Sequence, residues 1–155
     1  MMRAFMALVL SMFCGLAGAQ PIKTEVVQKD GQWQLLRAGK PYFIKGIGGD
    51  ASRQLAVDLG ANSFRTWGDE GLDAKLAEAQ KLGMTVTVGI WLGQERHGFD
   101  YRNADKVAEQ YEKARKIILK YKDHPSVLMW GIGNEMEGEK GDNAAIWSAI
   151  NNIAS

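Results

Sequence analysis

An asparagine and a glutamate stand side by side at the end of an apolar run, "VLMWGIGNEMEG", at residues 127–138. On an extended strand Gly131, Gly133 and Glu135 fall on one face, so the two glycines leave space below the carboxylate. A carboxyl group in such a partly apolar pocket has its charged form desolvated. Glu135 is therefore predicted to act as a general acid, which must stay protonated near neutral pH. A solvated glutamate in a strand–helix loop fits the same spacing equally well.

The elements that must position this pair alternate along the chain. Strands are predicted at 42–49, 61–67, 84–93 and 126–133. Helices are predicted from Asp50 or Ser52 to Leu59 and at 71–83, 103–122 and 143–154. This alternation indicates a parallel sheet with helices outside it, either in a (β/α)8 barrel or in a doubly wound open sheet. The stretch "KGIGGDAS" after the first strand lacks the G-x-G-x-x-G spacing of a dinucleotide-binding open sheet.

The number of units points to half of a barrel. A complete barrel needs roughly 250 residues, whereas this chain supplies about four βα units. The predicted fold class is α/β, the N-terminal half of a (β/α)8 TIM barrel, preceded by a β-hairpin that turns at Asp30-Gly31. The hairpin occupies 20–41, with Trp33 expected to plug the bottom of the barrel, and the truncated barrel domain occupies 42–155. Such a half would expose two sheet edges and an apolar inner face.

The first nineteen residues resemble a signal peptide. Arg3 precedes an apolar stretch that is too short to span a bilayer, and Ala17-Gly18-Ala19 has the form of a signal-peptidase site. Cleavage before Gln20 predicts an exported, periplasmic or extracellular protein with no stable membrane insertion. The alternative is an N-terminal membrane anchor.

The remaining chain is formally neutral, because the loss of Arg3 leaves 18 basic and 18 acidic residues. This balance argues against a nucleic-acid partner. Cys14 is the single cysteine and lies in the leader, and His97 and His124 are far apart in sequence. No metal site and no cofactor are therefore expected.

In a barrel, functional residues gather at the carboxyl ends of the strands. The side chains expected to meet there are Arg65, Trp67, Trp91, His97, Asn134 and Glu135. Aromatic rings can stack on the apolar faces of sugar rings, while amides, carboxylates and arginine bind hydroxyl groups. The set predicts an oligosaccharide or polysaccharide substrate. The two tryptophans and His97 are assigned by position alone, and core packing or a surface loop are their alternatives.

Several stretches resemble a known group of enzymes. "WGIGNE" at 130–135 resembles the fourth-strand motif of clan A retaining glycoside hydrolases, which are (β/α)8 barrels. "GKPYFIKGIG" at 39–48 and "LGANSFRTW" at 59–67 resemble the entry and second strand of glycoside hydrolase family 2 barrels and their relatives. "YKDHPSVLMWGIGNE" at 121–135 resembles the third-helix to fourth-strand stretch of the same group. The resemblance covers roughly residues 39–138.

The resemblance implies a role for three residues. Glu135 matches the general acid/base, and Asn134 matches the residue that hydrogen-bonds the substrate 2-hydroxyl. Arg65 matches an arginine near the nucleophile, where its charge helps to keep a carboxylate ionised. The nucleophile of the clan is a glutamate at the end of the seventh strand, which this chain does not contain. Glu95 is only a weak candidate for a substitute.

Three functional hypotheses follow. The first is a secreted retaining glycosidase or transglycosylase, of which this chain is an N-terminal fragment that is inactive alone. The second is a catalytically inactive, carbohydrate-binding relic of such a barrel. The third is an unrelated barrel enzyme such as a phosphate-binding isomerase, and the aromatic rim and the leader argue against it. The sugar, the linkage and the oligomeric state do not follow from the sequence.

Overall fold

The computed structural model describes residues 21–138, 141 and 143–155. The predicted signal peptide at 1–19, with Cys14, lies outside these residues, and its prediction stands untested. None of the helices in the described ranges is long and apolar enough to cross a membrane.

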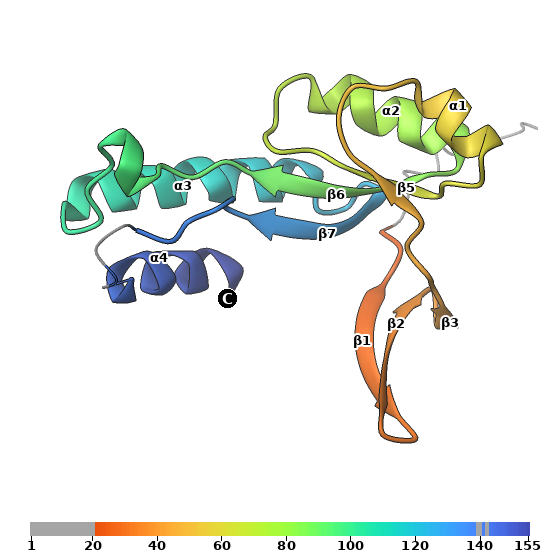
Figure 1. The fold of residues 1–155 in the computed structure, drawn as a ribbon, viewed down its shortest axis with the longest axis horizontal. Helices are drawn as coiled ribbons and strands as arrows, with labels where there is room; N and C mark the ends of the chain where they lie inside the picture. Colours follow the sequence, from red (N-terminus) through yellow and green to blue (C-terminus); the bar gives the residue numbers. More distant parts are fainter. Residues whose placement is uncertain (1–20, 139–140, 142) are drawn as a thin grey trace, which may run out of the picture.

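The described chain begins with a small antiparallel sheet that projects from the rest of the molecule (Figure 1). It consists of β1 (Thr24–Lys29), β2 (Gln32–Arg37) and β3 (Lys40–Pro41). Asp30 and Gly31 join β1 to β2, with φ angles of 51° and 76°. Positive φ at both turn positions suits the right-handed twist of a hairpin, and this confirms the hairpin prediction.

The prediction for Trp33 is wrong, because this side chain is 71% exposed on the projecting hairpin. Tyr42 instead lies at the amino ends of two of the parallel strands. Its hydroxyl lies 3.0 Å from the carbonyl oxygen of Asn62 and 3.0 Å from Thr85 Oγ1, at the starts of two strands. Arg37 anchors the hairpin to the same end by donating to the carbonyl of Pro125 over 2.7 Å.

Four parallel strands follow the chain order without reversal. They are β4 (Gly46–Ile47), β5 (Ser63–Arg65), β6 (Thr85–Ile90) and β7 (Val127–Ile132). The helices between and after them are α1 (Arg53–Asp58), α2 (Leu72–Leu82), α3 (Ala104–Tyr121) and α4 (Ala144–Ala154), with a 3-10 turn η1 (Glu95–His97). This is the predicted α/β order of a partial barrel, and β4 and β7 are its edge strands among the described residues.

Local sequence signals explain the helix boundaries. Asn103 caps α3 by accepting a hydrogen bond from the backbone N–H of Lys106, and Ser52 caps α1 in the same way. Gly83 ends α2 in the left-handed conformation, which glycine adopts without a steric cost. The buried stripe of α2 consists of Leu72, Leu76 and Ala79, at helical spacing.

The two faces of the parallel sheet differ in chemistry. The outer residues of β6 (Val86, Val88 and Ile90) are at most 2% exposed and pack under the helices in two core clusters. The inner residues alternate with them and are Ser63, Arg65, Thr85, Thr87, Gly89, Met129 and Gly131. The prediction of an apolar inner face is therefore wrong for most of these positions, because polar side chains and glycines occupy them and Met129 is the one large apolar side chain among them.

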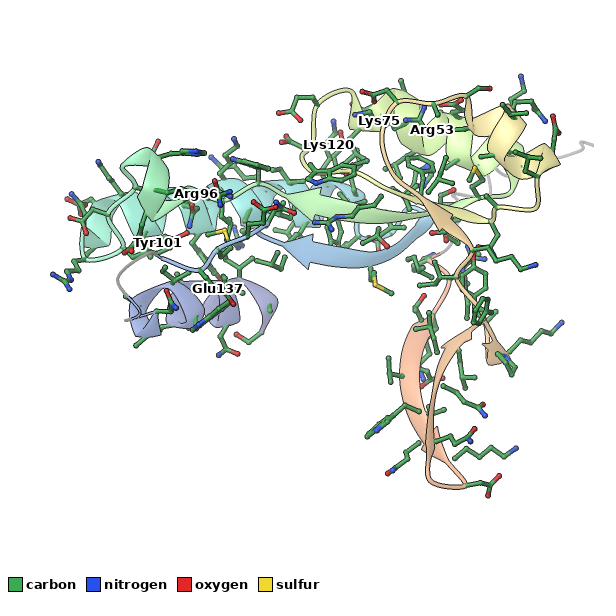
Figure 2. The ribbon with its side chains drawn as sticks, in the orientation of Figure 1. Arg53, Lys75, Arg96, Tyr101, Lys120 and Glu137 are labelled. Carbon is green, nitrogen blue, oxygen red and sulfur yellow. The ribbon has the colours of Figure 1, made fainter. Side chains whose placement is uncertain are left out.

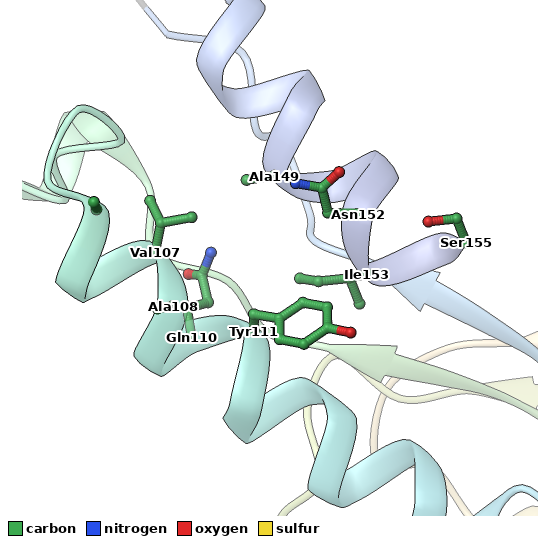
Figure 3. Close-up of a pocket in the computed structure, with 9 residues that line it drawn as sticks. Val107, Ala108, Gln110, Tyr111, Ala149, Asn152, Ile153 and Ser155 are labelled. Atoms are coloured by element: carbon green, nitrogen blue, oxygen red, sulfur yellow. The ribbon is translucent and has the colours of Figure 1, made fainter.

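A groove of about 560 Å³ runs between α3 and α4 on the helical layer (Figure 3). Its apolar lining includes Val107, Tyr111 and Ile153. This groove marks where the two helices pack incompletely, since the facing residues Ala108 and Ala149 are small.

Candidate active site

Asn134 lies at the centre of a hydrogen-bond network at the carboxyl ends of three strands. Its side-chain Oδ1 accepts from Arg65 Nη2 over 2.9 Å, and its backbone carbonyl accepts from Gln94 Nε2 over 2.6 Å. Arg65 ends β5, Gln94 follows β6 and Asn134 follows β7. The structure thus brings Arg65 and Asn134 together, as the sequence predicts for residues at the ends of parallel strands.

Glu135 reaches the same network through Arg96. Its Oε2 lies 2.8 Å from Arg96 Nη2, and Arg96 Nε donates to Gln94 Oε1 over 3.0 Å. The Glu135 side chain is 69% exposed. The predicted apolar pocket around Glu135 is therefore not present, and this carboxylate lies in an open ion pair instead.

The backbone explains why the strand pattern fails at Glu135. The chain turns at Gly133, with φ 75°, and Glu135 itself has φ 48°, so the alternation of strand faces ends before the carboxylate. The space below Gly133 is filled by Met136, which is 5% exposed. A Cβ atom on Gly133 would lie 2.6 Å from Met136 Cγ. A left-handed φ on a non-glycine residue such as Glu135 is uncommon and occurs mostly in turns.

Gly89 allows β5 and β6 to approach closely at the same rim. A Cβ atom on Gly89 would overlap the carbonyl oxygen of Thr66 and lie 2.7 Å from the carbonyl carbon of Trp67. The backbone N–H of Gly89 donates to Thr66 Oγ1 over 3.0 Å. Because residue 89 has no side chain, the backbone of Thr66 and Trp67 can lie directly against β6.

The loop that carries Gln94 and Arg96 is held from both sides of Gly93. The backbone N–H of Gly93 donates to Gln110 Oε1 over 2.6 Å, and the Tyr101 hydroxyl donates to the Gly93 carbonyl over 2.7 Å. Burial raises the pKa of Tyr101, so this hydroxyl keeps the proton that it donates. The Phe99 ring packs directly on Gly93 and lies 4.7 Å from the Tyr101 ring between centroids.

The remaining predicted site residues lie near the rim but outside the network. Trp67 and Trp91 are 42% and 46% exposed, and both lie outside the two core clusters. The guanidinium carbon of Arg65 lies 5.1 Å from the centre of the Trp67 ring. His97 is exposed on η1, and within the described part of the chain its imidazole has no hydrogen-bond partner. Their substrate contacts remain predictions.

The sequence reasoning assigned no role at the site to Gln94 and missed Arg96. A signal was available, because both follow the third strand directly, in the segment "WLGQERHG". Glu95, between them, points to the loop after β7, where its Oε2 would lie 2.5 Å from a Cβ atom on Gly138. Figure 2 labels Arg96 and Tyr101 at this end of the molecule. Among the residues with described positions, no cluster of histidine and acidic side chains could hold a metal ion.

A family sequence model described as "Glycosyl hydrolases family 2, TIM barrel domain" matches residues 75–153, just over half of the chain. The structure is also similar to solved glycosidases. A β-D-glucuronidase from Dictyoglomus thermophilum shares 24% identity at a TM-score of 0.57, over 85% of this chain and 26% of that one.

A family 2 β-galacturonidase from Eisenbergiella tayi, bound to galacturonate, shares 25% identity at a TM-score of 0.56, over 86% of this chain and 26% of that one. A β-glucuronidase from Ruminococcus gnavus shares 17% identity at a TM-score of 0.60, over 86% and 24% of the two chains. The chain therefore spans about a quarter of the length of these enzymes.

Proposed function

Because the chain belongs to glycoside hydrolase family 2 through its TIM barrel domain, we propose that it supplies the proton-donor side of a retaining glycosidase site. The observation that supports this proposal is the 2.9 Å bond from Arg65, at the end of β5, to Asn134, the residue directly before Glu135. The family alone supports a glycosidase and a carbohydrate substrate. The retaining mechanism and the residue roles are our proposals.

In this proposal Glu135 donates a proton to the leaving-group oxygen and later takes one from water. Asn134 binds the substrate 2-hydroxyl. Since Arg65 donates to Oδ1 of Asn134, the amide is oriented, and its NH2 group is left to donate to that hydroxyl. The network thus fixes which end of the amide faces the sugar.

The ion pair between Glu135 and Arg96 must open before Glu135 can reach a glycosidic oxygen. Exposed pairs of this kind contribute only about 0–1 kcal/mol, and both side chains here are partly or largely exposed. Binding of a sugar can therefore displace Arg96 from Glu135 at little cost. Arg96 would then be free to donate to a hydroxyl of the substrate.

A retaining glycosidase needs a second carboxylate at roughly 5–5.5 Å from the first. We propose that this nucleophile is supplied by a barrel strand outside these 155 residues and that Arg65 holds it ionised. Arg65 Nε is buried and lacks a hydrogen-bond partner among the residues that the structure describes, so one donor of this guanidinium remains available. By this reasoning, residues 1–155 alone are inactive.

The alternative proposal is an inactive relic that binds carbohydrate without cleaving it. We also propose that the protein is exported, on the strength of the leader at 1–19. The first substrates to test are suggested by the activities of the similar enzymes: 4-nitrophenyl β-D-galacturonide and β-D-glucuronide, beside the neutral galactoside and glucoside.

The test uses the natural gene product, meaning the protein that the complete gene encodes. Proton NMR measures the anomeric configuration of the sugar that this protein releases first. A retaining mechanism predicts that a β-glycoside first releases the β-anomer of the sugar. First release of the α-anomer would contradict the mechanism, and no hydrolysis of any member of a broad aryl-glycoside panel would favour the relic.

A further inference from the structure

A separate cavity of about 210 Å³ opens at the same rim, between the loop after β4 and the loop after β5. We refer to it as the loop pocket. Its polar and aromatic lining consists of Asp50, Arg53, Arg65, Trp67, Glu70 and Lys75. Pockets for drug-sized ligands measure roughly 300–1,000 Å³, so the loop pocket suits one small ring and not an extended chain.

The Trp67 ring gives the loop pocket a fixed aromatic wall. The ring packs against Gly48, where a Cβ atom would lie 2.8 Å from ring atom Cη2. Arg65 holds the ring from another side, at 5.1 Å from its centre. The ring is nevertheless 42% exposed, so part of it is available for stacking on a ligand.

Most of the charged side chains that line the loop pocket have no ion-pair partner among the described residues. Lys75, Asp50 and Glu70 form no ion pair within residues 21–138, 141 and 143–155, whereas Arg53 is bound to Glu78 at 2.7 Å. Figure 2 labels Lys75 and Arg53 near one another beside α1 and α2. The Glu70 carboxylate lies over Gly68, where a Cβ atom would come within 2.6 Å of Oε2.

This mixture of charges matches a neutral polyhydroxyl ligand. An ammonium group only donates hydrogen bonds and a carboxylate only accepts them, whereas each hydroxyl can do both. With Arg53 bound to Glu78, the carboxylates of Asp50 and Glu70 balance the cationic groups of Arg65 and Lys75, so the lining offers the carboxylate of an acidic sugar ring no net attraction to offset its desolvation. The loop pocket therefore favours a neutral ring over a uronic acid.

Arg65 connects the loop pocket to the active site, because it lines the cavity and donates to Asn134. We propose that the loop pocket binds one neutral sugar ring of the substrate, next to the ring whose bond is cleaved. This inference rests on the proposed function, and it implies an oligosaccharide substrate rather than a small glycoside.

In the experiment the natural gene product is titrated with four neutral trisaccharides (cellotriose, laminaritriose, mannotriose and β-1,4-galactotriose) and with trigalacturonate. Tryptophan fluorescence and saturation-transfer NMR measure the binding. We expect at least one neutral trisaccharide to bind. Lys75→Met and Glu70→Gln should each weaken its binding by about tenfold, the usual effect of one charge-assisted hydrogen bond. Trp67→Ala should abolish binding and Trp67→Phe should restore part of it, which separates stacking from misfolding.

Trp147→Ala is the matched control, because Trp147 is 47% exposed on α4, outside the loop pocket. This variant should bind the trisaccharide as the parent protein does. Three results would each refute the proposed sugar site in the loop pocket. They are no binding of any neutral trisaccharide, binding by the Lys75 and Trp67 variants as tight as that of the parent protein, and tighter binding of trigalacturonate than of the neutral trisaccharides. Failure of the catalytic proposal is seen separately, as normal trisaccharide binding with no Glu135-dependent hydrolysis.

Discussion

The Nε2 atom of Gln94 lies 2.6 Å from the backbone carbonyl oxygen of Asn134 and ties the loop after β6 to the end of β7. Gln94 is 3% exposed, and its Oε1 accepts from Arg96, which in turn holds Glu135. One buried amide therefore orients both members of the Asn-Glu pair, although neither contacts it through its own side chain.

Gln94→Leu should destabilise the protein by about 1–3 kcal/mol, because it leaves the partly buried carbonyl of Asn134 without its donor. Urea unfolding followed by circular dichroism measures this loss. Gln80→Leu, on the exposed side of α2, is the control and should change the free energy of unfolding by less than about 0.5 kcal/mol. Equal effects of the two substitutions would show that the 2.6 Å bond contributes nothing to stability.

Gly89→Ala and Gly131→Ala form a matched pair, since the two glycines lie opposite one another in β6 and β7. A methyl group at 89 would strike the backbone of Thr66 and Trp67, whereas at 131 the nearest atoms lie 3.9 Å away. We expect Gly89→Ala to cost about 1–3 kcal/mol and Gly131→Ala to change stability by less than about 1 kcal/mol. Thermal denaturation of both variants tests this order, and the reverse order would refute the close approach of β5 and β6.

Glu135→Gln should abolish hydrolysis of glycosides with poor leaving groups and spare activated aryl glycosides more. Activated leaving groups need little protonation, so they depend less on a general acid. Steady-state rates on both substrate types, in the natural gene product, measure the difference. Glu137→Gln, two residues along in the same exposed loop, should leave both rates unchanged. Equal losses on the two substrate types in Glu135→Gln would count against the acid assignment.

His124 should make stability depend on pH. Its Nδ1 accepts from the backbone N–H of Ser126 over 3.1 Å, and burial lowers the pKa of the imidazole. The unfolded chain therefore takes up a proton first as pH falls below about 6.5, so the stability present above that pH is progressively lost. His124→Asn keeps an acceptor without a titrating group and should flatten this decline. An unchanged pH dependence of the unfolding free energy in His124→Asn would assign the decline to other groups.

Residues 20–155 produced alone should associate. The β4 edge is open, and the neighbouring side chains Phe43, Leu55 and Leu59 are 80%, 57% and 80% exposed. Sedimentation velocity should show oligomers whose proportion falls in a Phe43→Ser and Leu59→Ser double variant. Val26→Ser, at a 63% exposed position on the hairpin, is the control and should not change the proportion. A single monomer boundary for the parent fragment would refute the expectation.

The sequence by itself determined the order of the elements and the rim that they form. Alternating apolar runs and helical stripes located β6 and β7 to within three residues at each end, and a helical period of apolar residues located α3 to within one residue at each end, as 103–122 against the observed Ala104–Tyr121. These signals are local, because caps, glycines and periodicity act within a few residues. The parallel order then placed Arg65 and Asn134 at one edge of the sheet.

Only the tertiary structure decided what surrounds Glu135. The bond from Gln94 to Asn134 spans 40 residues, the ion pair from Arg96 to Glu135 spans 39, and the bond from Arg65 to Asn134 spans 69. Strand periodicity predicted an apolar pocket at Glu135, but the turn at Gly133 ends that periodicity and Met136 fills the space. The exposed position of Trp33 likewise depends on how the hairpin departs from the parallel sheet. Pattern along the chain assigns residues to faces, whereas contacts between distant segments decide which of those faces meet.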